Sequence, residues 1–492
     1  MYLGIDLGTS GVKVVLMDEQ FRVQESQSIS LTCDHPHPLW SEQAPAQWWQ
    51  ATEQALDQLA KRTSLQAVKA IGVTGQMHGA VLVDSDGQPL RPAILWNDGR
   101  CAPQCERLNQ RAPSIERITG NQLMTGMTAP KLLWVAEHEP DIFSQIAQVL
   151  LPKDYLRWKL SGCYATDMSD ASGTLWLNVA TRQWDETLLE ACGLTLQQVP
   201  PLLEGPEVSG HLLEEHQQRW GFSSAVPIVA GGGDNAAGAL GVGVWQSGQA
   251  MLSLGTSGVY FAVSDGFYAN SRQAVHSFCH ALPETWHLMS VMLSAAFCLD
   301  WGAKITGQAS VSDFLQLAQH AKVEDRSPIF LPYLAGERTP HNDPYATGSF
   351  TGLTAQHGLA ELAFAVIEGV SLGLAQGMAA LHQSGVVPTS VTLIGGGAKS
   401  EFWRQLLADV TGQCLDYRQD GDVGPALGAA RLAKMACSPA LSLAEHFPLS
   451  PVVATYRPQP ERHRFFQQRL GLFQQKYRQL SGETQGELAQ VG

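Results

Sequence analysis

The same five-residue turn occurs twice in this chain, about half of the 492 residues apart. Residues 7–11 read LGTSG, and residues 254–258 repeat these five letters without a change. Each copy stands between two short apolar runs, which are Tyr2–Ile5 and Val12–Leu16 in the first case and Ala250–Ser253 and Val259–Val263 in the second. Apolar runs on both sides of a Gly/Thr/Ser turn predict a β-hairpin. Two such hairpins half a chain apart predict two structurally related halves that face each other.

Short apolar runs alternate with segments of helical periodicity through the rest of the chain. We predict strands at Ala70–Thr74, Ala80–Val83 and Val391–Ile394, and helices at Pro45–Arg62, Ala129–Glu137 and Ser400–Val410. This alternation is typical of α/β sheets that are covered by helices on both sides. We therefore expect one domain over residues 1–244, a second over 245–440, and a helical tail over 441–492 that packs on the second domain, with a hinge near Val244–Gly248.

The charge balance and the apolar pattern exclude several classes of protein. Asp and Glu number 46 against 32 Lys and Arg, and a net charge of −14 argues against a nucleic-acid partner. The most apolar stretch, Leu359 to Leu381, is interrupted by Glu361 and Glu368, so no membrane partner is expected. The nine scattered cysteines and the N-terminus that begins directly with a strand predict reduced thiols and a cytoplasmic location. The sequence leaves open whether a homodimer forms.

Each LGTSG turn offers backbone N–H groups and hydroxyls where glycine lets a ligand approach closely. A neutral loop can bind phosphate oxygens in this way, although an ordinary polar hairpin turn remains the alternative for either copy. Asp6 ends the strand before the first turn, where a carboxylate could hold Mg²⁺ through water. Lys13 follows the same turn and is either a phosphate ligand or a solvated strand residue.

Two glycine-rich junctions join predicted strands to helices. Residues 231–236 read GGGDNA, but a dinucleotide fingerprint would need an acidic residue at the end of the next strand, and Met251–Gly255 has none. Asp234 in this junction is either a helix N-cap or a general base beside a hydroxylated substrate. Residues 395–400 read GGGAKS and lack the second glycine that a P-loop requires, so close approach to a nucleotide and a packing turn both remain open.

Other polar patches are less specific. Met77-His78 and the segment Trp96–Arg100 lie at predicted strand ends, where small-ligand sites often occur, although core and turn roles are the default. His276, Cys279 and His280 have a tolerable spacing for a metal, but their flanks predict a buried strand and no further ligands are apparent. We therefore reject a metal site at these three residues.

Taken in this order, the motifs resemble those of the FGGY carbohydrate kinases, which belong to the actin-like ATPase superfamily. The resemblance covers about residues 1–440, and residues 126–134 (GMTAPKLLW) and 348–369 are similar to two signature segments of the family. It implies two actin-like (ribonuclease H-like) ATPase domains with a cleft between them, a sugar-binding N-terminal domain, a nucleotide-binding C-terminal domain, and the cofactors ATP and Mg²⁺.

The resemblance also implies roles for single residues. Asp234 would be the catalytic base and Asp6 would hold Mg²⁺. The phosphate channel would be lined by Thr9, Ser10, Lys13, Gly255 and Thr256, the nucleoside would lie near Gly396 and Gly397, and the sugar would contact Met77, His78, Trp96, Asp234 and Asn235.

The motifs around Gln76–Gly79, Trp96–Arg100 and Gly233–Asn235 are most similar to those of family members that act on D-xylulose. Phosphorylation at O5 to D-xylulose 5-phosphate is therefore the implied reaction. Glycerol is disfavoured, because glycerol kinases carry an Arg-Glu pair where Met77-His78 stands. The alternatives are a family member that acts on L-ribulose or gluconate, and a non-metabolic actin-like ATPase.

Overall fold

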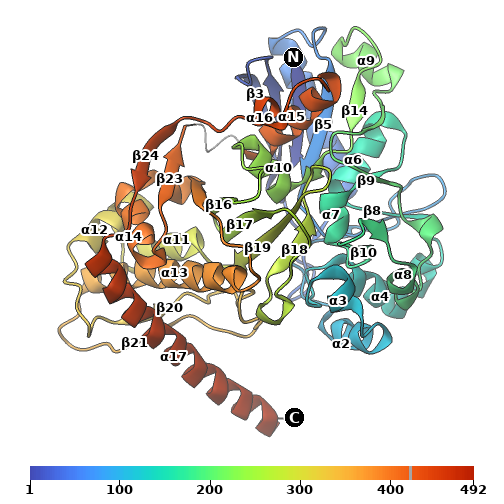
Figure 1. Cartoon of the computed structure of the whole chain (residues 1–492). Helices are drawn as coiled ribbons and strands as arrows, with labels where there is room; N and C mark the ends of the chain where they lie inside the picture. Colours follow the sequence, from blue (N-terminus) through green and yellow to red (C-terminus); the bar gives the residue numbers. More distant parts are fainter. Residues whose placement is uncertain (420–423, 492) are drawn as a thin grey trace.

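The computed structural model describes residues 1–419 and 424–491, with side chains described as far as residue 481. The chain forms two α/β halves, and each half is built on a seven-stranded sheet (Figure 1). The strands of the first sheet are β1 (Tyr2–Leu7), β2 (Gly11–Met17), β3 (Val23–Ser30), β5 (Ala70–Gly75), β13 (Val208–His211), β14 (Pro227–Val229) and β15 (Gly232–Gly233). Those of the second are β16 (Gln249–Leu254), β17 (Gly258–Ser264), β18 (His276–Cys279), β19 (Trp286–Met292), β22 (Ser390–Ile394), β23 (Leu415–Arg418) and β24 (Val452–Tyr456).

Both predicted hairpins are confirmed. Strands β1 and β2 pair in antiparallel fashion with Asp6 opposite Lys13, and β16 and β17 pair with Leu254 opposite Gly258. The two sheets also share one plan. The order β13-β14-β5-β1-β2-β3 has the same succession of parallel and antiparallel neighbours as β24-β23-β22-β16-β17-β19. The duplicated turn therefore marks a duplicated sheet.

Helices and short strand pairs surround the two sheets. In the first half the helices are α1 (Pro45–Arg62), α2 (Ala102–Arg111), α3 (Ile115–Thr119), α4 (Thr128–His138), α5 (Pro140–Phe143), α6 (Pro152–Ser161), α7 (Met168–Ser172), α8 (Glu186–Ala191), α9 (Glu214–Trp220) and α10 (Asp234–Gly241). Later in the chain they are α11 (Ala296–Ile305), α12 (Val311–Gln319), α13 (Leu359–His382), α14 (Glu401–Thr411), α15 (Gly424–Cys437), α16 (Leu443–His446) and α17 (Pro460–Val491). The short strands are β4 (Glu42–Gln43), β6 (Val81–Val83), β7 (Ala93–Ile94), β8 (Gln148–Leu150), β9 (Thr166–Asp167), β10 (Leu177–Asn178), β11 (Gln183–Trp184), β12 (Leu202–Leu203), β20 (Ile329–Leu331) and β21 (Ser349–Thr351).

Helix α15 comes from the second half of the chain but lies beside β5 of the first sheet (Figure 1). It covers the face of that sheet opposite α1. Glycine makes this close packing possible, because a Cβ atom on Gly72 would lie 2.0 Å from the carbonyl oxygen of Ala429. Helix α10 crosses α15 just as closely, since a Cβ atom on Gly428 would lie 1.7 Å from the oxygen of Ala237. The part of the chain after residue 244 thus contributes to both halves. The predicted domain boundaries near residues 244 and 440 stay a prediction.

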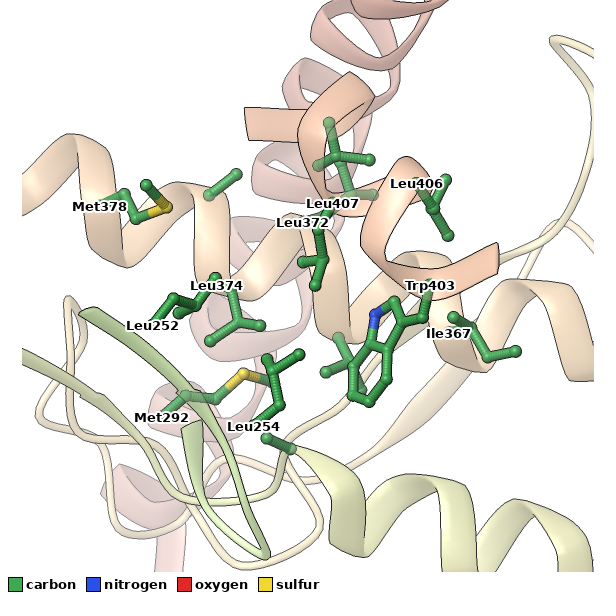
Figure 2. Packing of buried hydrophobic residues seen from close by; sticks show 14 of the residues in the cluster. Leu252, Leu254, Met292, Ile367, Leu372, Leu374, Met378, Trp403, Leu406 and Leu407 are labelled. Atoms are coloured by element: carbon green, nitrogen blue, oxygen red, sulfur yellow. The ribbon is translucent and has the colours of Figure 1, made fainter. Parts of the chain in front are cut away.

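The core of the second half fixes the strand that leads into the second LGTSG turn. Leu252 and Leu254 of β16 pack among apolar side chains of α13 and α14, including Leu374 and Trp403 (Figure 2). The indole of Trp403 is fully buried and donates a hydrogen bond of 3.0 Å to the Ser371 hydroxyl. Position 254 is therefore held rigidly, which is what a loop needs if it is to position a ligand.

Helix α13 is long and apolar enough to cross a membrane by length and composition, but 83% of its most apolar window is buried inside the protein. The C-terminal helix α17 packs against α13 and α14. Arg469 of α17 is buried and donates to Glu368 of α13, with 2.7 Å between Nε and Oε1. The long apolar helix is thus a core element to which the tail is tied.

Candidate active site

A cavity of about 210 Å³ lies between the two halves of the chain. All five residues that the sequence predicted for the sugar line it, namely Met77, His78, Trp96, Asp234 and Asn235. The wall from the second half is formed by Ser253, Gly255, Ser257, Val259, His276, Met289, Val291 and Arg338. The structure therefore brings together residues that are up to 261 positions apart, although their roles stay a prediction.

Asp234 is the first residue of α10 and follows the short strand β15. Its Oδ1 atom accepts hydrogen bonds from the backbone N–H of Asn235 at 2.7 Å and from the Asn235 side chain at 2.9 Å. The preceding N–H, that of Gly233, donates to the Ser169 hydroxyl at 3.0 Å and so fixes the start of the helix. Burial raises the pKa of Asp234 to about 6, while the two bonds from Asn235 oppose the shift. A carboxyl group with this pKa can accept a proton near neutral pH.

Asp6 is half-buried near the end of β1, and its buried Oδ1 atom has no hydrogen-bond partner among the described residues. Burial and then repulsion from Asp234 raise the pKa of Asp6 to about 7, whereas Lys13 lowers it. Repulsion between two carboxyl groups acts mainly when they lie near each other. Two neighbouring carboxyls with unused oxygen atoms are a donor set that suits a divalent cation. Across the described residues, no group of three or more His, Cys, Asp or Glu side chains could hold a metal ion.

His78 has a left-handed backbone conformation with φ of 67°. Its carbonyl oxygen accepts hydrogen bonds from the buried Lys131 ammonium at 2.8 Å and from the Thr128 hydroxyl at 3.1 Å. Its Nδ1 atom lies 3.0 Å from the carbonyl oxygen of Gly173, so Nδ1 carries the proton and Nε2 is the acceptor of the neutral ring. Burial lowers the pKa of His78 to about 3, and the ring is therefore neutral at physiological pH.

Lys131 was not predicted to act in the site, although it stands in the quoted segment 126–134. It bonds the carbonyl oxygen of Gly126 at 2.8 Å as well as that of His78. The sequence does not show that Lys131 is completely buried, because a lysine in an amphipathic helix is ordinarily exposed. Lys131 therefore positions the backbone around the cavity.

The first LGTSG turn is tied to the floor of the cavity through Thr9. The Thr9 hydroxyl donates to Gln76 at 2.9 Å and accepts from the indole N–H of Trp96 at 3.0 Å. Ser10, in contrast, is exposed. The segment after Trp96 is held by a buried ion cluster in which Arg100 pairs with Asp98 at 2.6 Å, so these two residues support the site structurally.

A larger cavity of about 890 Å³ lies wholly in the second half. Gly255, Thr256, Gly396 and Gly397 line it as predicted for the nucleotide side, together with Leu299, Asp300, Leu315, Gln316, Lys399 and Phe402. Its volume falls in the range typical of small-molecule and cofactor sites. The second LGTSG turn is fixed here, because its Gly255 and Thr256 carbonyl oxygens accept from Ala296 and Ala295 at the start of α11, both at 2.9 Å.

A third cavity of about 500 Å³ joins the other two. It shares Asp234 and Asn235 with the smaller cavity and Gly396 and Lys399 with the larger one. Gly255 lines both the smaller and the larger cavity. The three cavities therefore adjoin one another, and Asp234 lines two of them. Group transfer requires two bound molecules to lie next to each other in this way.

Comparison with known proteins shows what this chain is similar to. The models of the N-terminal and C-terminal domains of the FGGY family of carbohydrate kinases match residues 1–241 and 250–437. The chain is 60% identical over 481 residues to the xylulose kinase of Escherichia coli (strain K12), covering 98% of this chain and 99% of that protein.

Solved structures of sugar kinases are also similar to this chain. A "xyloylose kinase" from Brucella ovis has a TM-score of 0.93 and 42% sequence identity, covering 98% of this chain and 99% of that one. A gluconate kinase from Lactobacillus acidophilus has a TM-score of 0.91 at 28% identity and covers 97% of each chain. These similarities confirm the predicted two-domain fold.

Proposed function

Because the chain belongs to the FGGY family of carbohydrate kinases, we propose that it transfers the γ-phosphoryl group of ATP to O5 of D-xylulose, giving D-xylulose 5-phosphate and ADP. One observation carries this proposal. Asp234 lines both the small cavity and the 500 Å³ cavity, which shares Gly396 and Lys399 with the cofactor-sized cavity. The choice of sugar rests on the high identity to the xylulose kinase of Escherichia coli.

Asp234 acts as the general base in this proposal. As the sugar O5 attacks the γ-phosphorus atom, the O5–H bond breaks and the proton passes to the Asp234 carboxylate, while the bond from phosphorus to the bridging oxygen of ADP breaks. A pKa of about 6 keeps Asp234 ionised above neutral pH and still basic enough to accept a proton. The two hydrogen bonds from Asn235 to Oδ1 orient the carboxylate and leave Oδ2 for the substrate.

The residues present fit a magnesium ion. Mg²⁺ is usually held by one or two carboxylates together with substrate phosphates, and Asp6 has an unpartnered buried oxygen beside Asp234. When bound, the ion would neutralise charge on the transferring phosphoryl group. The phosphates would be held by the two LGTSG turns and Lys13, through Thr9, Ser10, Gly255 and Thr256, and the nucleoside by Gly396 and Gly397.

The sugar side of the cavity suits a neutral polyol. Neutral His78 and the Asn235 amide offer hydrogen bonds, whereas Met77 and the indole of Trp96 offer apolar contact.

All nine cysteines are free thiols, which agrees with the proposed cytoplasmic location.

A panel of sugars assayed for ADP release tests the proposed function. We expect the highest kcat/KM with D-xylulose, lower values with L-ribulose and gluconate, and very low values with glycerol, because unpaired polar groups in a site can cost ~10⁴-fold. A higher kcat/KM with L-ribulose or gluconate would replace the substrate but keep the kinase. ADP release that no sugar stimulates would instead favour a non-metabolic ATPase.

A further inference from the structure

Arg338 is a cavity residue for which the sequence predicted no role. Among the described residues that line the 210 Å³ cavity, only Asp234 and Arg338 carry a side-chain charge at neutral pH. The pKa values of His78 and His276 both lie below their usual range because the rings are buried, so neither adds a positive charge. Within the described chain the guanidinium of Arg338 has no hydrogen-bond or ion-pair partner at bonding distance. Its donors are therefore available to a ligand.

The backbone on both sides of Arg338 is fixed to strand β19. The Glu337 carboxylate accepts from the N–H of Leu293 at 3.0 Å and from that of Arg338 at 2.7 Å. The Thr339 hydroxyl accepts from the N–H of Val291 at 3.0 Å, and the Thr339 N–H donates to the oxygen of Val291 at 3.1 Å. Five donors on a side chain with such a fixed base form a pre-organised binding group.

The side chain of Arg338 reaches from the second half to the first. Its Nη2 atom lies so close to Gly126 that a Cβ atom there would be only 3.0 Å away. Gly126 is joined to His78 through Lys131, which bonds both carbonyl oxygens. Arg338 also lines a groove of about 340 Å³ between the halves, together with Gly126, Glu337 and Asn342. Arg338 therefore lies where the cavity and this groove meet, and His78 lines the same cavity.

Arg338 and Asp234 act on different parts of the cavity. Arg338 also lines the 340 Å³ groove beside Gly126, whereas Asp234 also lines the 500 Å³ cavity beside Gly396. A ketose whose terminal O5 lies at Asp234 has its ketone at the opposite end of the molecule.

We propose that Arg338 binds the ketone end of the sugar, donating hydrogen bonds from its guanidinium to the C2 carbonyl oxygen and the C1 hydroxyl. This assignment rests on the proposed function, because it takes the substrate to be a ketopentose phosphorylated at O5. It makes Arg338 the residue by which the second half recognises the sugar, while His78 and Asn235 bind it from the first half. The sugar would then connect the two halves directly.

The test compares Arg338→Met with wild type on ketose and alditol ligands. Arg338→Met removes hydrogen bonds from a charged donor, so kcat/KM for D-xylulose should fall about 10- to 100-fold. KM for ATP should change less than about threefold, because Arg338 is proposed to contact only the sugar. Xylitol and D-arabitol, the two alditols made by reducing C2, serve as competitive inhibitors of D-xylulose turnover. Their inhibition constants should rise less than the KM for D-xylulose, so that the preference for the ketose shrinks. Arg338→Lys should restore only part of the loss, because lysine lacks the planar fork.

Arg272→Gln is the matched control, because Arg272 is an exposed arginine of the same half. It should leave all constants at wild-type values. The assignment of Arg338 would be overturned if Arg338→Met weakened binding of D-xylulose and of the two alditols by the same factor. An unchanged kcat/KM for D-xylulose in this variant would overturn it as well. Wild-type enzyme that does not phosphorylate D-xylulose would overturn the proposed function instead, so the two failures are distinguishable.

Discussion

Replacing Asp234 with Asn should make the protein nearly inactive and, at neutral pH, more stable. Asn keeps the shape of the side chain and one oxygen atom, which can still accept both hydrogen bonds from Asn235. It removes the proton acceptor, and general-base catalysis contributes ~10²–10⁴-fold. We expect kcat to fall by at least that factor, while D-xylulose still binds.

The gain in stability follows from the pKa of Asp234, which burial raises from 3.8 to about 6. As pH rises through 3.8 the unfolded chain loses its proton first, and the folded protein keeps it until about pH 6. Folding therefore becomes less favourable across this window, by about 3 kcal/mol for a difference of two pKa units. The Asp234→Asn variant escapes this cost, so its advantage over wild type should be small at pH 4.5 and largest above pH 6.

Calorimetry at pH 4.5 and pH 7.5 measures this difference, and a steady-state assay of the same samples measures kcat. The melting temperature of Asp234→Asn should exceed that of wild type by about 3 °C or more at pH 7.5. Asp265→Asn, in an exposed turn after β17, is the control and should change neither quantity. Two results would refute the reasoning. One is a near-normal kcat in Asp234→Asn, and the other is a gain in melting temperature over wild type that is smaller at pH 7.5 than at pH 4.5.

Three further predictions concern metal, sugar and closure. Asp6→Ala should abolish most of kcat and change the Mg²⁺ dependence, because metal and phosphate positioning supply most of the catalysis in phosphoryl transfer; an unchanged Mg²⁺ titration would leave Asp6 a structural role only. His78→Ala should raise KM for the sugar much more than KM for ATP, and an equal rise in both would contradict a contact on the sugar side. Small-angle scattering should show a smaller radius of gyration with sugar and a non-hydrolysable ATP analogue, whereas no change at saturation would exclude a large closure.

The duplicated turn predicted the fold well because hairpins are local. Each LGTSG segment has its two strands directly beside it, so the pairing of β1 with β2 and of β16 with β17 follows from neighbouring residues. Helix α15 shows the limit of this reasoning. Its position on the first sheet depends on Gly72, which allows a backbone contact with Ala429 across more than 350 positions. No local pattern contains that information.

The sequence brought Met77, His78, Asp234 and Asn235 to attention because they follow predicted strands and glycines, and all four line the small cavity, while their roles stay a prediction. Lys131 and Arg338 could not be assigned in this way. Lys131 functions through complete burial against two carbonyl oxygens, and Arg338 stands in a loop whose place is set by bonds to β19. Both depend on tertiary contacts, for which a charged side chain in the sequence gives no sign.

The identity of the phosphorylated carbon tests the central claim most directly. D-xylulose, L-ribulose and gluconate at equal concentrations would compete for a limiting amount of ATP, and ¹³C and ³¹P NMR would identify the product. We predict that nearly all phosphate appears on C5 of D-xylulose, because the proposed function has Asp234 activate the terminal hydroxyl where the two cavities adjoin. Phosphate on another carbon of D-xylulose, or mainly on another sugar, would contradict the proposed placement of the substrate.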